Sequence, residues 1–277
     1  MNALHRPEVH YVLGHAEPEL QRLIRQSVFY SELTEDLLRR AGLTTGMRVL
    51  DVGCGAGDVS LLAARLVGPT GKVVGVDRSP QALGLARQRA EFAQLGHVSF
   101  VEGDLTQLDL PHSFDALVGR FVLMYLPDPA DGLRRMARHV RAGGIVAFQE
   151  MDMGAARPSP LMALHAQCGE WIKTTFQRGN VEIQMGPKLY ATFREAGLPG
   201  ASMTLGARVG GAHDGSAQEY IADVVASLLP MIERAGVATA AEVGIETLAT
   251  RLQEEARACD GVMISPSIIG AWTRKPE

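Results

Sequence analysis

The stretch VLDVGCGAG, from Val49 to Gly57, places three glycines in five positions directly after an apolar run. Such a strand-to-helix turn lets a ligand approach the backbone closely and exposes the N–H groups at the start of the following helix. The turn lacks the lysine of a phosphate-binding P-loop, because Asp58 and Val59 follow Gly57. Its Gly-x-Gly-x-Gly spacing also departs from the Gly-x-Gly-x-x-Gly fingerprint of dinucleotide-binding proteins, which counts against a pyrophosphate ligand.

Acidic residues accompany the apolar segments around this turn. Asp51 lies inside the first segment, Asp77 ends KVVGVD, and Asp104 ends HVSFVEGD. A carboxylate about 20 residues beyond the glycines can accept both hydroxyls of a ribose, and one at the next strand end can accept from an adenine amino group. The charge of Asp51 would repel a pyrophosphate but would attract an ammonium group. The three acids therefore favour a cationic nucleoside over a polyanionic one.

Strand-like and helix-like segments alternate along the chain, as is typical of a parallel sheet covered by helices on both faces. The predicted strands are 47–53, 72–77, 97–104, one within 114–126, 145–152, 201–210 and 267–275. The predicted helices are one or two within 18–41, then 58–66, 79–96, 128–144, 160–177, 187–196, 216–235 and 239–258. The span between the sixth and last strands is too long for a hairpin, so we interpret it as a helical insertion that caps the fold.

Composition places the chain among soluble globular proteins. Of its 277 residues 46% are hydrophobic and 21% are charged, and the formal net charge is −4. A mildly acidic chain lacks the broad basic surface of a nucleic-acid-binding protein, so we expect no nucleic-acid partner. The cysteines, Cys54, Cys168 and Cys259, form no CxxC pair and no cluster with histidine, which favours a reducing cytoplasm and predicts no metal site. Without a signal peptide or an apolar run of about 20 residues, we expect a cytoplasmic protein with no membrane partner.

Several motifs in order along the chain carry a resemblance to a known family. VLDVGCGAG, VVGVD, VEGDL, FDALVGRFVLMYLPDP and VRAGG resemble the motifs of class I S-adenosylmethionine-dependent methyltransferases. The closest group is that of small-molecule enzymes like those of ubiquinone and menaquinone biosynthesis. The resemblance covers residues 46–152 most fully and extends to the N-terminal segment and to residues 189–206.

The resemblance implies a fold and a domain organisation. The fold class is α/β, with a Rossmann-like, doubly wound sheet of seven mostly parallel strands whose last strand is antiparallel. N-terminal helices precede the sheet, and a helical cap is inserted before the last strand. We predict a single methyltransferase domain over residues 1–277. Its parts are an N-terminal helical cap (1–45), a cofactor-binding core (46–152), substrate-side helices with the sixth strand (153–213), a helical insertion (214–260) and the last strand (261–277).

The resemblance also assigns the cofactor, S-adenosylmethionine, which leaves as S-adenosylhomocysteine. Asp51, Gly53 and Gly55 would hold its methionine part, and Gly57 is also expected to bind the cofactor. Asp77 would hold the ribose hydroxyls, with Arg78 beside the adenine. Asp104 and Leu105 would bind and cover the adenine, and Arg120 would present its backbone near the sulfonium. Tyr11 and Gln26 would lie over the cofactor or the substrate.

Candidate residues for catalysis and substrate binding follow the core motifs. Glu150 ends the fifth predicted strand, near where the substrate must meet the methyl group, and His165 falls in the segment that borders the substrate pocket. Either could act as a base or orient the substrate. Aromatic side chains could line a pocket for an apolar or aromatic substrate; they are Tyr30, Tyr125, Trp171 and Phe176.

We therefore hypothesise methyl transfer to a small, fairly apolar molecule at an O, N or C atom. The displacement would be in line and driven mainly by proximity and orientation, with a base required only if the acceptor must lose a proton. No Asp/Asn-Pro-Pro-Tyr stretch is present, which argues against exocyclic amines of adenine or glutamine as acceptors. The expected partner is a small-molecule substrate, and a homodimer is compatible with the sequence. Two alternatives stay open: an NAD(P)-dependent oxidoreductase on a related fold, and a non-catalytic adenosylmethionine-binding protein.

Overall fold

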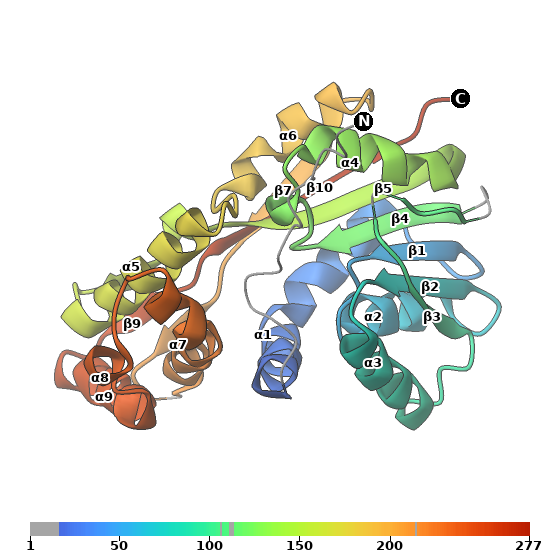
Figure 1. The fold of residues 1–277 in the computed structure, drawn as a ribbon. Helices are drawn as coiled ribbons and strands as arrows, with labels where there is room; N and C mark the ends of the chain where they lie inside the picture. The colour runs from blue at the N-terminus through green and yellow to red at the C-terminus, as the bar shows by residue number, and fades with distance from the viewer. Residues whose placement is uncertain (1–16, 106, 111–113, 214) are drawn as a thin grey trace, which may run out of the picture.

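The main sheet takes strands from most of the length of the chain (Figure 1). The computed structural model describes residues 17–105, 107–110, 114–213 and 215–277. The strands of this sheet are β1 (Arg48–Val52), β2 (Lys72–Asp77), β3 (Val98–Glu102), β4 (Phe114–Arg120), β5 (Val140–Asp152), β7 (Ser202–Gly206) and β10 (Ser267–Arg274). They lie side by side in the order β3-β2-β1-β4-β5-β10-β7.

The pairing of the strands confirms the predicted fold class. β1 pairs in parallel with β2 and β4, and the parallel pattern continues to β3 on one side and β5 on the other. β10 runs antiparallel to both β5 and β7. The winding direction of the sheet reverses between β1 and β4. Their carboxyl ends therefore border a crevice, which is where open parallel sheets bind ligands.

Helices cover both faces of the sheet. Successive side chains of a strand point to opposite sides, and in β1 the side chains on both sides are buried. Val49 of β1 packs in a buried cluster with Leu38 of the first helix. The next residue, Leu50, belongs to a second buried cluster with Leu133 and Phe193 of two later helices. In chain order, the helices before β7 are α1 (Glu17–Ala41), α2 (Asp58–Val67), α3 (Pro80–Phe92), α4 (Pro129–Met136), α5 (Ala163–Arg178) and α6 (Met185–Glu195).

The helix predicted over 128–144 is shorter than expected, and the fifth strand begins earlier. α4 ends at Met136, a 3₁₀ turn follows, and β5 already starts at Val140. Gly143 adopts a φ of +67°, which a continuing helix does not allow, and a Cβ on Gly144 would lie 2.4 Å from a methyl group of Val140. Glycines are also poor helix formers. The VRAGG motif therefore belongs to the strand.

A second, three-stranded sheet was not predicted. It consists of β6 (Arg157–Ser159), β8 (Val209–Gly211) and β9 (Val262–Ile264), in the antiparallel order β6-β9-β8. The strand predicted over 201–210 is thus wrong as one unit, because the chain leaves the main sheet after Gly206 and enters the small sheet at Val209. Strands of three residues are too short to show a periodic pattern.

The predicted helical insertion before the last strand consists of α7 (Ser216–Arg234), α8 (Ala240–Val243) and α9 (Ile245–Ala258). α7 packs against both α5 and α9, and it also contacts α1. In Figure 1 these helices and α5 form a lobe beside the carboxyl ends of the central strands. We call α5, α7, α8 and α9 the helical lobe. None of the described helices is long and apolar enough to cross a bilayer.

The packing of β4 against β5 can be tested at Gly119. A Cβ at this position would lie 2.5 Å from the ring of Phe148 and 3.2 Å from Val52, both buried. We expect Gly119→Ala to lower the free energy of unfolding by about 1–3 kcal/mol, measured by chemical denaturation.

A matched control is Gly84→Ala in α3, where an added Cβ would have nothing within 4 Å. Alanine favours the helix there, so this variant should raise the free energy of unfolding by about 0.5–1 kcal/mol. A Gly119→Ala protein as stable as the wild type would contradict the close packing of the two strands.

Candidate active site

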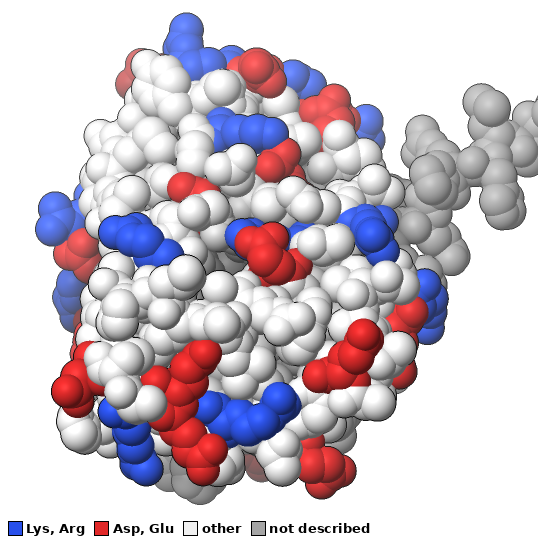
Figure 2. Space-filling model, turned by 90° about the vertical axis from the view of Figure 1, so that its left-hand side faces the viewer, with Lys and Arg blue, Asp and Glu red and all other residues white. Residues whose placement is uncertain are grey.

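A cavity of about 1360 Å³ lies between the carboxyl ends of the central strands and the helical lobe. One part is bordered by the glycine turn and by polar side chains after β2 and β3. The other part is bordered by apolar side chains of the helical lobe, of β5 and of β9. On the face of the molecule that the lobe occupies, acidic and basic side chains are interspersed among wide uncharged areas (Figure 2). We refer to the two parts as the nucleoside half and the acceptor half.

The glycine turn shapes the floor of the nucleoside half. Gly53 and Gly55 have φ angles of +63° and +51°, a backbone conformation that favours glycine, and both line the cavity. A Cβ on Gly53 would lie 2.7 Å from a methyl group of Val122, so the turn after β1 touches the turn after β4. Gly57 does not line the cavity. Its position would bring a Cβ to 3.0 Å from Ala86, so this glycine allows α2 to pack against α3.

Asp77 stands at the edge of the nucleoside half with both oxygens oriented by backbone donors. Gly55 N–H donates to one oxygen and Ser79 N–H to the other, each at 2.9 Å. Each carboxylate oxygen can accept a second hydrogen bond, so two adjacent acceptors are held for a diol. The side chains predicted for the adenine also line this half; they are Arg78, Asp104 and Leu105.

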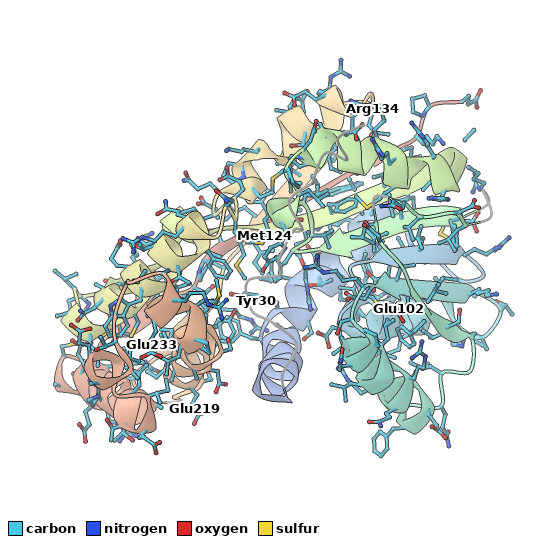
Figure 3. All side chains as sticks on the ribbon, viewed as in Figure 1. Tyr30, Glu102, Met124, Arg134, Glu219 and Glu233 are labelled. Carbon is cyan, nitrogen blue, oxygen red and sulfur yellow. The ribbon has the colours of Figure 1, made fainter. Side chains whose placement is uncertain are left out.

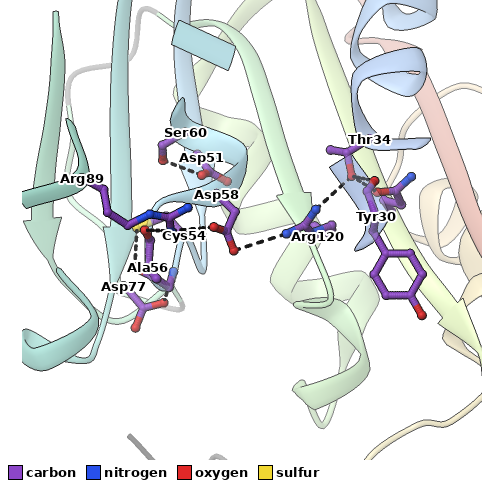
Figure 4. Close-up of polar contacts among 12 residues, drawn as sticks. Tyr30, Thr34, Asp51, Cys54, Ala56, Asp58, Ser60, Asp77, Arg89 and Arg120 are labelled. Atoms are coloured by element: carbon purple, nitrogen blue, oxygen red, sulfur yellow. Dashed lines mark hydrogen bonds and ion pairs between the residues drawn. The ribbon is translucent and has the colours of Figure 1, made fainter. Parts of the chain in front are cut away.

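The side chain of Arg120 also faces the cavity, which goes beyond the predicted backbone role. Its guanidinium donates to Thr34 Oγ1 at 3.0 Å and lies 3.5 Å from Asp58 Oδ2 (Figure 4). Arg89 holds the other oxygen of Asp58 at 2.6 Å. Thr34 in turn donates to Gln149 of β5 at 2.7 Å. This network links α3, α2, β4, α1 and β5. Its charged members are Arg89, Arg120 and Asp58, so the network carries a net positive charge beside the glycine turn.

The acceptor half is mostly apolar. Its lining includes Met124, Met151, Met153, Met263, Tyr125, Phe176, Tyr220, Ile221, Val224 and His165. Of the four predicted substrate-binding aromatics, Tyr125 and Phe176 therefore line the cavity. Tyr30 and Trp171 are buried and do not. Tyr30 instead supports three lining rings edge-on: Phe29 at 4.8 Å, and Phe121 and Tyr220 each at 5.9 Å between ring centroids. Figure 3 shows Tyr30 and Met124 between the helical lobe and the sheet.

Comparisons with known proteins bear on what this cavity holds. A family model described as a methyltransferase domain matches residues 43–197, which is more than half of the chain. The chain belongs to this methyltransferase family. A demethylmenaquinone methyltransferase from Geobacillus kaustophilus is 37% identical over 117 residues, which are 42% of this chain and 50% of that protein. This chain thus spans about half the length of that relative.

Solved structures agree on the fold. An S-adenosylmethionine-dependent methyltransferase from Aquifex aeolicus has a TM-score of 0.51 at 22% identity, over 70% of this chain and 92% of its own. The [4+2]-cyclase SpnF has a TM-score of 0.53 at 23% identity, over 88% of this chain and 80% of its own. At such identities the likeness concerns the fold alone. The predicted class I family and its cofactor, S-adenosylmethionine, are confirmed, and the nicotinamide alternative is set aside.

The nucleoside half of this methyltransferase fits that cofactor. The two oriented oxygens of Asp77 suit the ribose hydroxyls, and the net positive charge of the Arg120 network suits a methionine carboxylate. The assignment of Asp51 changes. Its carboxyl group is 1% exposed, accepts a 2.6 Å bond from Ser60 and does not line the cavity. Burial raises the pKa of Asp51 to about 7, although Ser60 and Arg120 oppose the rise, so its attraction for an ammonium group is weakened.

Glu150, a predicted catalytic residue of the methyltransferase, occupies a structural position. It is fully buried and does not line the cavity; one oxygen accepts from the N–H groups of Val122 and Leu123 at 2.9 and 2.7 Å. Burial raises the pKa of Glu150 to about 7, against the effect of the backbone donors. Phe121, the residue before Val122, has a φ of +57°, a backbone conformation that costs a non-glycine residue about 1–3 kcal/mol. Glu150 therefore stabilises a strained turn that borders the cavity.

The remaining predicted residues of the site are placed as follows. His165, the other predicted catalytic residue, lines the acceptor half and bonds Glu255 through its ring Nδ1 at 2.8 Å. Tyr11 lies outside the described residues. Gln26 belongs to α1, but its side chain is not described, so both assignments stay predictions. Sequence reasoning missed Thr34, Asp58, Arg89 and Glu255. Of these, only Asp58 could have been found from the sequence, because it directly follows the glycine turn.

The buried position of Glu150 predicts a pH dependence of stability. Because the pKa is higher in the folded protein than its ordinary value of 4.5, the group stabilises the fold fully below pH 4.5. This contribution is lost as the pH rises through about 7. Glu150→Gln keeps the acceptor for both N–H groups but does not titrate. From pH 4.5 to 8, wild-type stability should therefore fall relative to Glu150→Gln by about 3 kcal/mol.

Urea denaturation at several pH values measures this difference, and Asp51 contributes equally to both proteins. Parallel pH profiles for the two proteins would show that Glu150 is not buried as a neutral carboxyl group.

Proposed function

We propose that this chain transfers the methyl group of S-adenosylmethionine to a small, largely apolar molecule in the acceptor half of the cavity. The single observation that carries the proposal is the continuity of that cavity. It runs from Asp77 and the glycine turn, which suit the nucleoside, to the methionine and aromatic side chains around His165. A cofactor bound at one end would thus present its reactive group to a molecule bound at the other.

The chain would contribute binding and alignment. S-adenosylmethionine supplies a methyl group on a sulfonium, which is already a good leaving group. The residues therefore need to hold the acceptor atom and the methyl carbon about 3 Å apart and in line. Asp77 and the Arg120 network would fix the cofactor at its ribose and its carboxylate. The turn of Phe121 and Val122, held by Glu150, borders the junction of the two halves.

The acceptor half sets the properties of the substrate. Four methionines line it, and flexible thioether side chains adapt to planar rings and contact them favourably. The stacked pair of Phe29 and Tyr220, 4.8 Å apart between centroids, adds a flat aromatic wall. Relatives of this chain are named demethylmenaquinone methyltransferases, which supports an aromatic or quinone-like acceptor. Among the charged residues that line the cavity, Glu170 and Lys173 of α5 are paired with each other.

The likeness to SpnF keeps the alternative of cofactor binding without methyl transfer open. A protein of this fold is described as a cyclase, so binding of the cofactor and transfer of its methyl group have to be tested separately. The predicted homodimer stays a prediction.

The cofactor site is tested at Asp77. Asp77→Asn keeps the size of the side chain but removes its charge and one of its acceptors. We expect the dissociation constant of S-adenosylmethionine, measured by isothermal titration calorimetry, to rise at least about tenfold, since bonds to a charged group contribute about 1.5–3 kcal/mol each.

The matched control is Asp36→Asn, which removes an exposed ion pair with Arg40 on α1 and should leave the affinity unchanged. Unchanged affinity in Asp77→Asn would refute the ribose assignment.

Methyl transfer is tested separately with the wild-type protein, by detecting S-adenosylhomocysteine and the methylated aromatic acceptor by mass spectrometry. Cofactor binding without transfer to any acceptor would favour the non-catalytic alternative.

A further inference from the structure

Asp58 and Arg120 lie beside the glycine turn without forming a close ion pair (Figure 4). Arg120 Nη2 is 3.5 Å from Asp58 Oδ2. Bonds between an ionised donor and an ionised acceptor are shorter, commonly about 2.7–2.9 Å. Both residues line the cavity, and their side chains keep 8% and 9% of their surface exposed. A ligand in the nucleoside half can therefore reach a carboxylate and a guanidinium that are neighbours.

Other residues hold these two groups in place. Arg89 donates to Asp58 Oδ1 and to the carbonyl oxygen of Ala56, each at 2.6 Å, so it ties the carboxylate to the glycine turn. Thr34 Oγ1 accepts from Arg120 Nη1 at 3.0 Å. Neither Arg89 nor Thr34 lines the cavity. Within the described part of the chain, Asp58 Oδ2 and Arg120 Nη2 have no hydrogen bond shorter than the one between them.

Thr34 supports Arg120 from a buried position. It is 1% exposed, and its hydroxyl lies 2.7 Å from Gln149 Oε1 and 3.1 Å from the carbonyl oxygen of Tyr30. The hydroxyl has one proton to donate to either of these oxygens, and its lone pairs stay available for Arg120. Because Thr34 belongs to α1 and Gln149 to β5, two elements of the core fix the guanidinium.

This arrangement is complementary to a zwitterion. An α-amino acid carries an ammonium group and a carboxylate on one carbon atom, so both charges can meet neighbouring groups of opposite charge. Such bonds between ionised groups are stronger than those between neutral groups. Asp51, the predicted partner of the ammonium group, is 1% exposed and does not line the cavity, whereas Asp58 does.

We propose that Asp58 and Arg120 form a subsite for the amino-acid end of the cofactor, with the ammonium group on Asp58 and the carboxylate on Arg120. Thr34 and Arg89 are positioning residues of this subsite. The inference rests on the proposed function, which places the cofactor in the nucleoside half, and it adds a partner for each charge of the methionine part. It also transfers the role predicted for Asp51 to Asp58.

The test compares four nucleosides by isothermal titration calorimetry. The first is S-adenosylhomocysteine. The second is its analogue without the α-amino group, the third is its analogue without the carboxylate, and the fourth is methylthioadenosine, which lacks both groups. In the wild type, removal of either group should raise the dissociation constant about tenfold, because each removal breaks a bond between charged groups.

Substitution of each residue should affect only the nucleosides that carry its partner. Asp58→Asn should raise the dissociation constant of S-adenosylhomocysteine about tenfold but should not raise that of the analogue without the amino group. Arg120→Gln should weaken S-adenosylhomocysteine to a similar extent but not the analogue without the carboxylate. The matched control is Asp36→Asn, which removes an exposed ion pair with Arg40 and should leave all four constants unchanged.

Thr34→Val tests the positioning role, because valine keeps the shape of threonine but cannot accept from Arg120. We expect the dissociation constant of S-adenosylhomocysteine to rise about threefold, with no change for the analogue without the carboxylate. The matched control is Thr192→Val in α6. It removes a buried hydroxyl that bonds the carbonyl oxygen of Lys188 away from the cavity, and it should leave the affinities unchanged.

The other outcomes separate the subsite from the proposed function. Equal weakening of all four nucleosides in Asp58→Asn and Arg120→Gln would show a structural role and would overturn the subsite, while the proposed methyl transfer would stand. Equal wild-type affinity for S-adenosylhomocysteine and methylthioadenosine would also overturn the subsite. The expected pattern of affinities without methyl transfer to any aromatic acceptor would support the subsite and overturn the proposed transfer alone.

Discussion

The contact between the glycine turn after β1 and the strained turn after β4 is the constraint on which the rest of the site depends. The turn after β1 can approach the turn after β4 only because Gly53 has no Cβ, which would otherwise lie 2.7 Å from Val122. Phe121 enters the second turn with a φ of +57°, and the buried carboxyl group of Glu150 holds the next two N–H groups. This arrangement keeps the carboxyl ends of both strands open to a ligand at the point where the sheet reverses its winding.

Charge and polarity then divide the cavity around this contact. Asp77 presents two oriented acceptors on one side, and the chain of Arg89, Asp58 and Arg120 places positive charge beside the glycine turn. On the other side methionine and aromatic side chains form an apolar wall. A cofactor with a ribose and a carboxylate fits the first environment, and a flat apolar acceptor fits the second. We propose that the two ligands lie in this order along one cavity.

Much of the fold could be predicted from the sequence, because β1 to β4 are apolar runs and the glycine turn has a distinctive spacing. The start of β5 and the small sheet could not be predicted, since a glycine pair resembles a helix end and strands of three residues show no period. Some residues of the site could likewise be predicted from local sequence, and others could not. Asp77 stands at a strand end that the pattern locates, whereas Glu255 is distant in sequence from His165. Burial of Asp51, Glu150, Tyr30 and Trp171 depends on tertiary packing, which local sequence does not reveal.

The central claim is that one cavity places a nucleoside cofactor at Asp77 and its sulfur toward the acceptor half. A crystal structure of the protein with S-adenosylhomocysteine tests it most directly. The account predicts both ribose hydroxyls within hydrogen-bond distance of Asp77 and the methionine carboxylate beside Arg120. The sulfur should face the side of Met124 and Tyr125. A nucleoside bound away from Asp77, or a sulfur turned away from the apolar wall, would contradict the account.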